Sequence, residues 1–161
     1  MKHLVVILIG LSTHISYAQE NPIFLSGGAG YNPSPLWASY AINATYITGS
    51  NLFTIGFQNG SSLTDEGRDN FTELSAMYGK TYHDRWFRWH AAVGLCNASG
   101  DWEDNNEDDH DYSIIGVPIE TQIIITPVRF AGIGLKITKT FRDHSNGVLI
   151  MATLHLGKLM N

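Results

Sequence analysis

Apolar and polar positions alternate through residues 114–141 in two long runs. The first run places apolar residues, with one threonine, at Ile115, Val117, Ile119, Thr121, Ile123 and Ile125. The second, after Pro127, carries Ala131, Ile133, Leu135, Ile137, Lys139 and Phe141 on one face. A period of two predicts strands with two unlike faces. The predicted strands are far longer than the usual ~5–6 residues. A tilted strand needs roughly 9–11 residues to cross a bilayer, so the pattern predicts membrane-spanning strands.

The same alternation predicts eight antiparallel strands. Their expected ranges are 23–31, 36–47, 51–59, 70–82, 86–98, 112–126, 129–141 and 147–158. The expected connections alternate between short turns (48–50, 83–85, 127–128) and longer polar loops (32–35, 60–69, 99–111, 142–146). Short periplasmic turns opposite longer extracellular loops are typical of outer-membrane barrels. The pattern therefore predicts an all-β, up-and-down transmembrane barrel with both termini on the periplasmic side.

The two faces of these strands differ in composition. One face is apolar, whereas the other combines glycine, threonine and serine with a few charges. A soluble, lipocalin-like binding barrel in the periplasm would turn the apolar face inward, and its outer face would be rich in charged residues. Small residues with a few paired charges instead suit the narrow lumen of an eight-stranded barrel. The composition favours the membrane barrel over the soluble one.

Composition and charge narrow the choice of function. Only 16% of the residues are charged, against ~25% in typical soluble domains. The formal net charge of −5 gives no electrostatic footprint for a nucleic-acid partner. The single cysteine, Cys96, excludes an intrachain disulfide and a thiolate zinc cluster. No cofactor is expected.

The N-terminus has the pattern of a cleaved signal peptide. A short basic start precedes the apolar run Leu4–Leu11, and small residues stand at Ser16 and Ala18. The run is too short for a spanning helix, which needs ~20 residues. We expect cleavage after Ala18, which divides the chain into a signal peptide, 1–18, and one barrel domain, 19–161.

With this pattern, the chain resembles the small eight-stranded outer-membrane barrels, of the OmpX or OmpA transmembrane-domain type. The resemblance covers 19–161 and rests on architecture. His155, Gly157 and Leu159 partly match the assembly signal of that class, which ends on an aromatic residue, whereas this chain ends Leu-Met-Asn. The resemblance implies a monomer in the outer membrane of a Gram-negative bacterium. It would contact lipid, lipopolysaccharide and the assembly machinery, with a structural or surface-interaction role.

Several ionisable residues fall on the polar face. These are Glu73, Arg88, His90, Glu120, Lys136 and His155. Charges in a narrow lumen must pair, because an unpaired buried charge costs several kcal/mol. We expect a salt-bridge network that fills the lumen, with a catalytic or conducting site as the alternative. Cys96 shares this face and is expected to be a small lumen filler.

The stretch Asp101–Asp111 carries most of the excess negative charge. Its acids are Asp101, Glu103, Asp104, Glu107, Asp108, Asp109 and Asp111. Asp104, Asn106 and Asp108 match the first ligand positions of a calcium loop, but Asp109 and Ile115 stand where that loop requires glycine and glutamate. We expect a solvated acidic loop, with weak divalent-cation binding as the alternative and no firm metal site.

One enzyme class shares this architecture. Lipid A deacylases are eight-stranded outer-membrane barrels with a His-x-Ser-Asn element and a later glutamate. Here His144 directly precedes Ser145, and no glutamate follows. Neighbouring strand residues point to opposite faces, so His144 is poorly placed to activate Ser145. We therefore predict a hairpin loop without catalytic residues, and a deacylase-like enzyme remains the alternative.

Overall fold

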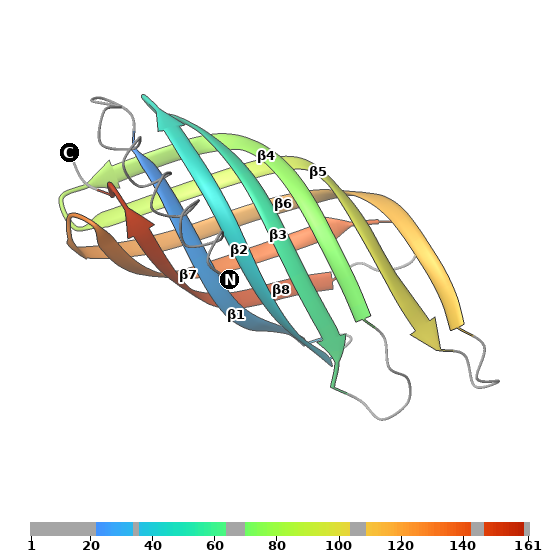
Figure 1. The fold of residues 1–161 in the computed structure, drawn as a ribbon. Coiled ribbons are helices and arrows are strands. Elements are labelled where there is room, and N and C mark those ends of the chain that lie inside the picture. The colour runs from blue at the N-terminus through green and yellow to red at the C-terminus, as the bar shows by residue number, and fades with distance from the viewer. Residues whose placement is uncertain (1–21, 34–35, 64–69, 104–108, 143–146, 160–161) are drawn as a thin grey trace, which may run out of the picture.

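The computed structural model describes residues 22–33, 36–63, 70–103, 109–142 and 147–159, with the side chains of 101–112 excepted. They form a closed barrel of eight antiparallel strands, each paired with its neighbour in the chain, and β1 pairs with β8 (Figure 1). The strands are β1 (Ile23–Pro33), β2 (Leu36–Thr48), β3 (Asn51–Ser62), β4 (Asn70–Asp84), β5 (Phe87–Glu103), β6 (Asp109–Val128), β7 (Ala131–Phe141) and β8 (Gly147–Gly157). The predicted eight-stranded barrel is confirmed.

Two of the three predicted short turns are displaced. The turn at 49–50 lies as predicted, but the others occupy 85–86 and 129–130 instead of 83–85 and 127–128. The β4–β5 ladder continues through the pairs His83–Arg88 and Asp84–Phe87. Pro127 remains within β6, where the pairing with β7 shifts between Ile125 and Val128. A bulge of this kind accepts a proline, because no ladder hydrogen bond is required of it.

Parts of the predicted extracellular loops belong to strands. The predicted loop at 99–111 is wrong for most of its length, since β5 continues to Glu103 and β6 begins at Asp109. The predicted loops at 32–35 and 60–69 also lose residues to β1 and β3, which end at Pro33 and Ser62. Beyond the hydrocarbon layer both faces of a strand meet water. The alternation that marks a strand therefore disappears there.

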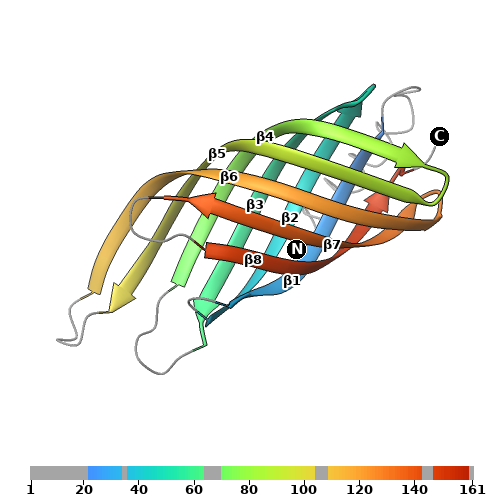
Figure 2. The same ribbon diagram turned by 180° about the vertical axis from the view of Figure 1, so that it is seen from behind.

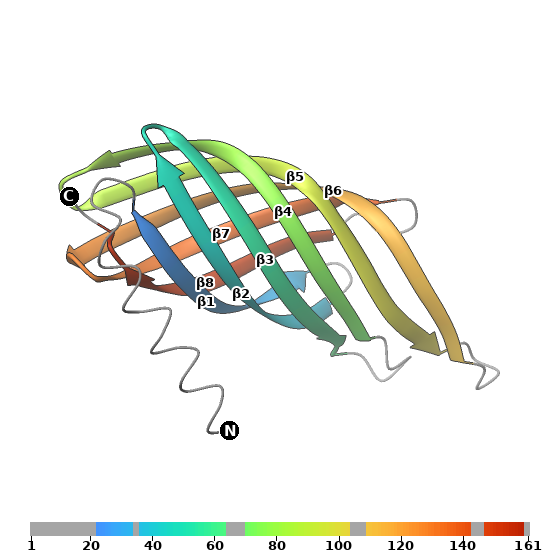
Figure 3. The same cartoon turned by 45° about the horizontal axis from the view of Figure 1, so that its top comes forward.

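At the long-loop end the β5–β6 hairpin extends beyond β7, whereas β4 pairs with β5 as far as the pair Asn70–Asp101. We call residues 97–103 and 109–116 the β5–β6 arm. The ladder between β6 and β7 begins only at Val117, which pairs with Phe141. Within the described chain, 109–116 therefore pair with β5 alone. The arm is seen as the yellow and orange extension in Figures 2 and 3.

Burial alternates along every strand, and the apolar face is outside. The exposed outward side chains include Leu25, Ile42, Ile55, Leu74, Val93, Leu95, Ile119, Ile123, Ile133 and Leu154. The inward positions carry buried small, polar and charged residues together with a cluster of apolar ones. The lipid-facing wall is mostly apolar, so the orientation of the faces is that of a barrel in lipid. In the part of the chain that the structure describes, we find no helix of the length and apolarity needed to cross a membrane.

Candidate functional site

The lumen is closed at the short-turn end by an apolar cluster. Its members are Phe24, Ile47, Leu52, Met77, Ala92, Ile124 and Leu159. Leu159 follows β8 and is 1% exposed. Its backbone N–H donates to the carbonyl of Arg129 at 2.9 Å. β8 ends at Gly157, whose φ of 141° is a backbone conformation that favours glycine. The strand predicted to reach residue 158 therefore ends one residue earlier, and the chain turns into the lumen.

Arg88 fixes this C-terminal segment. Its Nη2 donates a hydrogen bond of 2.5 Å to the carbonyl oxygen of Leu159. The guanidinium lies 5.9 Å from the centre of the Phe24 ring, within the range of a cation–π contact. Arg88 is 3% exposed, and its Nε has no hydrogen-bond partner. Arg88 thus connects the start of β5 to the end of the chain.

Three charged or ionisable groups meet halfway along the lumen. The carboxylate of Glu120 lies 3.3 Å from Lys136 Nζ and 3.5 Å from His90 Nε2. The three residues are 1–3% exposed and come from β6, β7 and β5. The register brings them together, because Gln122 of β6 pairs with both His90 and Lys136. We call Glu120, Lys136 and His90 the central charged cluster.

A neutral polar group adjoins this cluster. Gln122 Nε2 donates to Thr153 Oγ1 at 2.7 Å and lies 2.8 Å from His155 Nε2. Thr153 Oγ1 and His155 Nε2 are 3.0 Å apart. The imidazole of His155 is fully buried and packs edge-on against Phe24. Gln122, Thr153 and His155 thus lie between the central charged cluster and the apolar cluster at the short-turn end.

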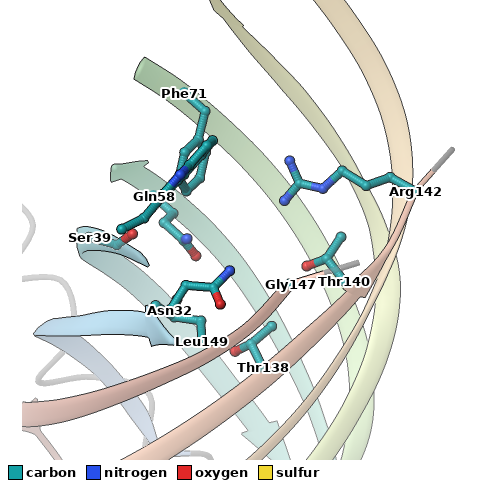
Figure 4. Close-up of a pocket in the computed structure, with 10 residues that line it drawn as sticks. Asn32, Ser39, Gln58, Phe71, Thr138, Thr140, Arg142, Gly147 and Leu149 are labelled. Atoms are coloured by element: carbon teal, nitrogen blue, oxygen red, sulfur yellow. The ribbon is translucent and has the colours of Figure 1, made fainter. Parts of the chain in front are cut away.

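A separate ion pair lies near the long-loop end. Arg142 Nη2 donates to Glu73 Oε2 at 2.8 Å, and the guanidinium lies 5.7 Å from the centre of the Phe71 ring. Figure 4 shows Arg142 reaching across the mouth of the barrel toward Gln58 and Phe71. The cavity beside it measures ≈ 30 Å³, against the ~10–15 Å³ that a single water needs.

The predicted lumen residues are all buried, but they do not form one network. Glu120, Lys136 and His90 are in contact, Glu73 pairs with Arg142, and Arg88 lies at the opposite end. Arg142 follows β7, in the predicted loop 142–146, and is not among the predicted lumen residues. The signal was present, since Lys136, Thr138, Thr140 and Arg142 have the same parity along β7 and its extension. Cys96 is 3% exposed on the lumen side.

The filled lumen limits the chemistry that the barrel can perform. A second lumen cavity, beside Glu73 and Lys136, measures only ≈ 10 Å³, so the two cavities have room for about one or two waters each. The described residues contain no group of three or more His, Cys, Asp or Glu side chains placed to hold a metal ion. The acidic side chains of 101–111 and the His144–Ser145 pair lie outside the described part, so the cation and deacylase alternatives stay untested.

Comparison by sequence identifies no relative: no protein-family model and no curated protein matches the chain. Comparison by structure finds proteins of similar fold. Neisserial surface protein A aligns with a TM-score of 0.69 at 9% identity, over 84% of this chain and 96% of that one. The N-terminal β-barrel domain of OprF from Pseudomonas aeruginosa gives 0.65 at 10% identity, over 86% and 98%. Ail, the attachment invasion locus protein of Yersinia pestis, gives 0.59 at 9% identity, over 86% and 96%.

These similarities concern the fold. The chain has the architecture of the small eight-stranded outer-membrane β-barrels, which confirms the resemblance inferred from its alternation pattern. At sequence identities near 10%, residues of this chain cannot be matched one by one with functional residues of these proteins. Function must therefore be argued from the lumen, the wall and the arm of this chain.

Proposed function

We propose that this protein is a non-conducting outer-membrane barrel that anchors a surface-interaction element, the β5–β6 arm, outside the cell. The protein is exported by its N-terminal signal, 1–18, and is inserted as a monomer by the assembly machinery. Its wall contacts lipid and lipopolysaccharide. The proposal assigns it no catalytic residue and no cofactor.

The packing of the lumen supports the anchoring role. Apolar side chains close one end, the central charged cluster fills the middle, and the Glu73–Arg142 pair crosses the other end. Eight strands give an interior only wide enough for side chains. The cavities of ≈ 30 Å³ near the long-loop end and ≈ 10 Å³ beside Glu73 and Lys136 leave no room for a solute, and the larger depression of ≈ 300 Å³ lies at the short-turn end, bounded by Arg88 and Leu159.

The observation that carries the surface role is the unequal length of the strands. β6 has 20 residues and β7 has 11, so β6 extends beyond β7 and one of its edges lacks a described partner, while β4 flanks the other side of the arm up to Asp101. A free strand edge offers backbone N–H and C=O groups to an extended segment of another chain. The arm and its connection contain seven acidic residues between 101 and 111, which favours a basic partner.

Conductance tests the anchoring role. The purified barrel should produce no stable channel steps in a planar lipid bilayer under an applied voltage. Steady openings that persist in a refolded, homogeneous sample would contradict the filled lumen and therefore the proposed role.

Shortening the arm tests the surface role. Ser99 and Ser113 are partners across the hairpin, so joining them by Asn-Gly in place of 100–112 leaves a favourable two-residue turn. A peptide of alternating lysine and valine, an extended basic probe, should bind the wild-type barrel in nanodiscs and lose most of its affinity for the shortened one. A full-length arm with its acids changed to Asn and Gln should bind weakly, which separates charge from edge pairing. Equal binding to the wild-type and shortened barrels would refute the role of the arm.

A further inference from the structure

The outer wall has an apolar groove over β2, β3, β4 and β5. Of these strands, β2 and β3 lie toward the viewer in Figure 1. Register explains the groove. Ala44, Ile55, Ala76 and Leu95 are cross-strand neighbours in one outward row, and Tyr46, Phe53, Tyr78 and Val93 form the next row toward the short turns. The two alanines leave a floor lower than the aromatic row. The depression measures ≈ 620 Å³ and its lining is almost entirely apolar.

A polar rim lies at the short-turn end of this groove. Lys80 Nζ donates to Asn51 Oδ1 at 2.6 Å, and Tyr78 Oη donates to the same oxygen at 2.8 Å. Asn51 is the first residue of β3 after the turn at 49–50, so the rim lies at the periplasmic edge of the wall. Lys80 is exposed, and no carboxylate of the described residues forms an ion pair with it.

We propose that this groove and its rim bind one anionic glycerophospholipid of the periplasmic leaflet. The acyl chain lies over Ala44 and Ala76, against the aromatic row, and the phosphate meets the ammonium of Lys80. An ammonium with one acceptor on the protein has two further N–H donors for a phosphate oxygen. A lysine at the membrane interface keeps its charged end at the level of the headgroups, which is where the lipid presents its negative charge.

The position of the polar rim at the periplasmic edge of the membrane favours a lipid over a second copy of the chain as the occupant of the groove. A copy packed on the groove would cover the alanine floor, but it would leave the exposed ammonium of Lys80 without the opposite charge that a phosphate supplies. The wall is already in contact with lipid if the proposed membrane location holds. The inference adds a defined place, a stoichiometry of one and a preference for a negative headgroup.

The chain offers matched controls. Ala76→Phe fills the groove, and Ala152→Phe adds the same bulk at an exposed alanine on the opposite wall, in β8. Lys80→Gln removes the charge of the rim, and Lys139→Gln removes an exposed lysine near the other end of the barrel. Each pair separates a local effect from a general change in hydrophobicity or charge.

The experiment is native mass spectrometry of the barrel in neutral detergent, titrated with phosphatidylglycerol or phosphatidylcholine. We expect one tightly bound phosphatidylglycerol. Ala76→Phe should weaken its binding about tenfold or more, equivalent to at least ~1.4 kcal/mol. Lys80→Gln should weaken it about fivefold and abolish the headgroup preference. Ala152→Phe and Lys139→Gln should bind as the wild type does.

Three outcomes would overturn the inference. They are equal binding of both lipids by the wild type, equal effects of Ala76→Phe and Ala152→Phe, and a dimer that Ala76→Phe dissociates. The inference rests on the proposed membrane location, and the two can fail separately. A protein that remains soluble without detergent refutes the location, whereas a membrane-bound barrel without headgroup preference refutes the lipid site alone.

Discussion

Replacing Lys136 with Met isolates the energetics of the lumen. Met keeps the length of the side chain and removes its charge. Glu120, 3% exposed, then retains only His90 Nε2 and the Thr138 hydroxyl, each at 3.5 Å. These contacts are longer than the ~2.7–3.2 Å of a good N–H···O bond and the ~2.5–3.0 Å of a good O–H···O bond. The carboxylate is therefore left buried without a strong partner.

The expected magnitude follows from the burial of both partners. Removing one member of a buried pair costs about 3–5 kcal/mol, mostly because the remaining charge stays in a medium of low dielectric constant. A loss of this size approaches half of the ~5–15 kcal/mol that typically stabilises a folded protein. The Lys136→Met variant should therefore unfold at a lower guanidinium concentration than the wild type.

The double variant Glu120→Gln/Lys136→Met tests whether the unpaired charge causes the loss of stability. With Glu120→Gln and Lys136→Met together no unpaired charge remains, and a neutral replacement of a buried pair often costs little. The double variant should lose less free energy than either single variant, so the coupling between the two sites is at least ~2 kcal/mol. Lys139→Met is the control on the same strand. Lys139 is exposed on the outer wall, where a lysine near the interface costs ~0–1 kcal/mol, so this variant should be as stable as the wild type or slightly more stable.

The assay is reversible guanidinium unfolding in detergent micelles, followed by the fluorescence of the four tryptophans. The reasoning about the lumen is wrong if Lys136→Met costs less than about 1 kcal/mol, or if the double variant loses the sum of the two single losses.

Three further predictions concern the two ends of the lumen. Leu159→Asp places a charge in the apolar cluster and should lower the unfolding free energy by about 3 kcal/mol or more, measured by the same titration, with no change if Leu159 lies outside the lumen. Arg142→Gln leaves Glu73 without its ion-pair partner and should cost about 2–4 kcal/mol; Arg142→Lys should recover part of this loss, and equal stability of all three proteins would contradict the pairing. Cys96, 3% exposed, should resist a charged maleimide in the folded barrel and react after unfolding, as mass spectrometry would show; rapid labelling of the folded protein would place it outside the lumen.

The sequence predicts the wall of this barrel better than its ends. Within the lipid-facing layer each position meets either hydrocarbon or the lumen, so the alternation at Ile115–Ile125 gives both the strand and its orientation. Between Ser99 and Tyr112 polar residues stand at positions of both parities, so no alternation marks a strand there. The ladder from Asp101–Asp111 to Ser99–Ser113 is therefore absent from the pattern, and the stretch resembles a loop.

The charged residues of the lumen show the same limit of prediction from sequence. Alternation along a strand assigns Glu73, Glu120 and Lys136 to the lumen face, because the face of a residue depends only on its position within its own strand. It does not determine which charges meet, since this depends on the stagger of the register around the closed barrel. Arg142 and Glu73 are 69 positions apart, and only closure of the barrel brings them together. The inward turn at Gly157–Leu159 is a tertiary effect of the same kind, set by Arg88 and the apolar cluster.

The most direct test of the account is the behaviour of the native protein on extraction and on a denaturing gel. A closed barrel with an apolar outer wall should remain in the outer-membrane fraction until detergent is added, and its unboiled form should migrate differently from the boiled form. Release by osmotic shock without detergent, with the same mobility before and after boiling, would contradict the account. The apolar wall would then have to be the interior surface.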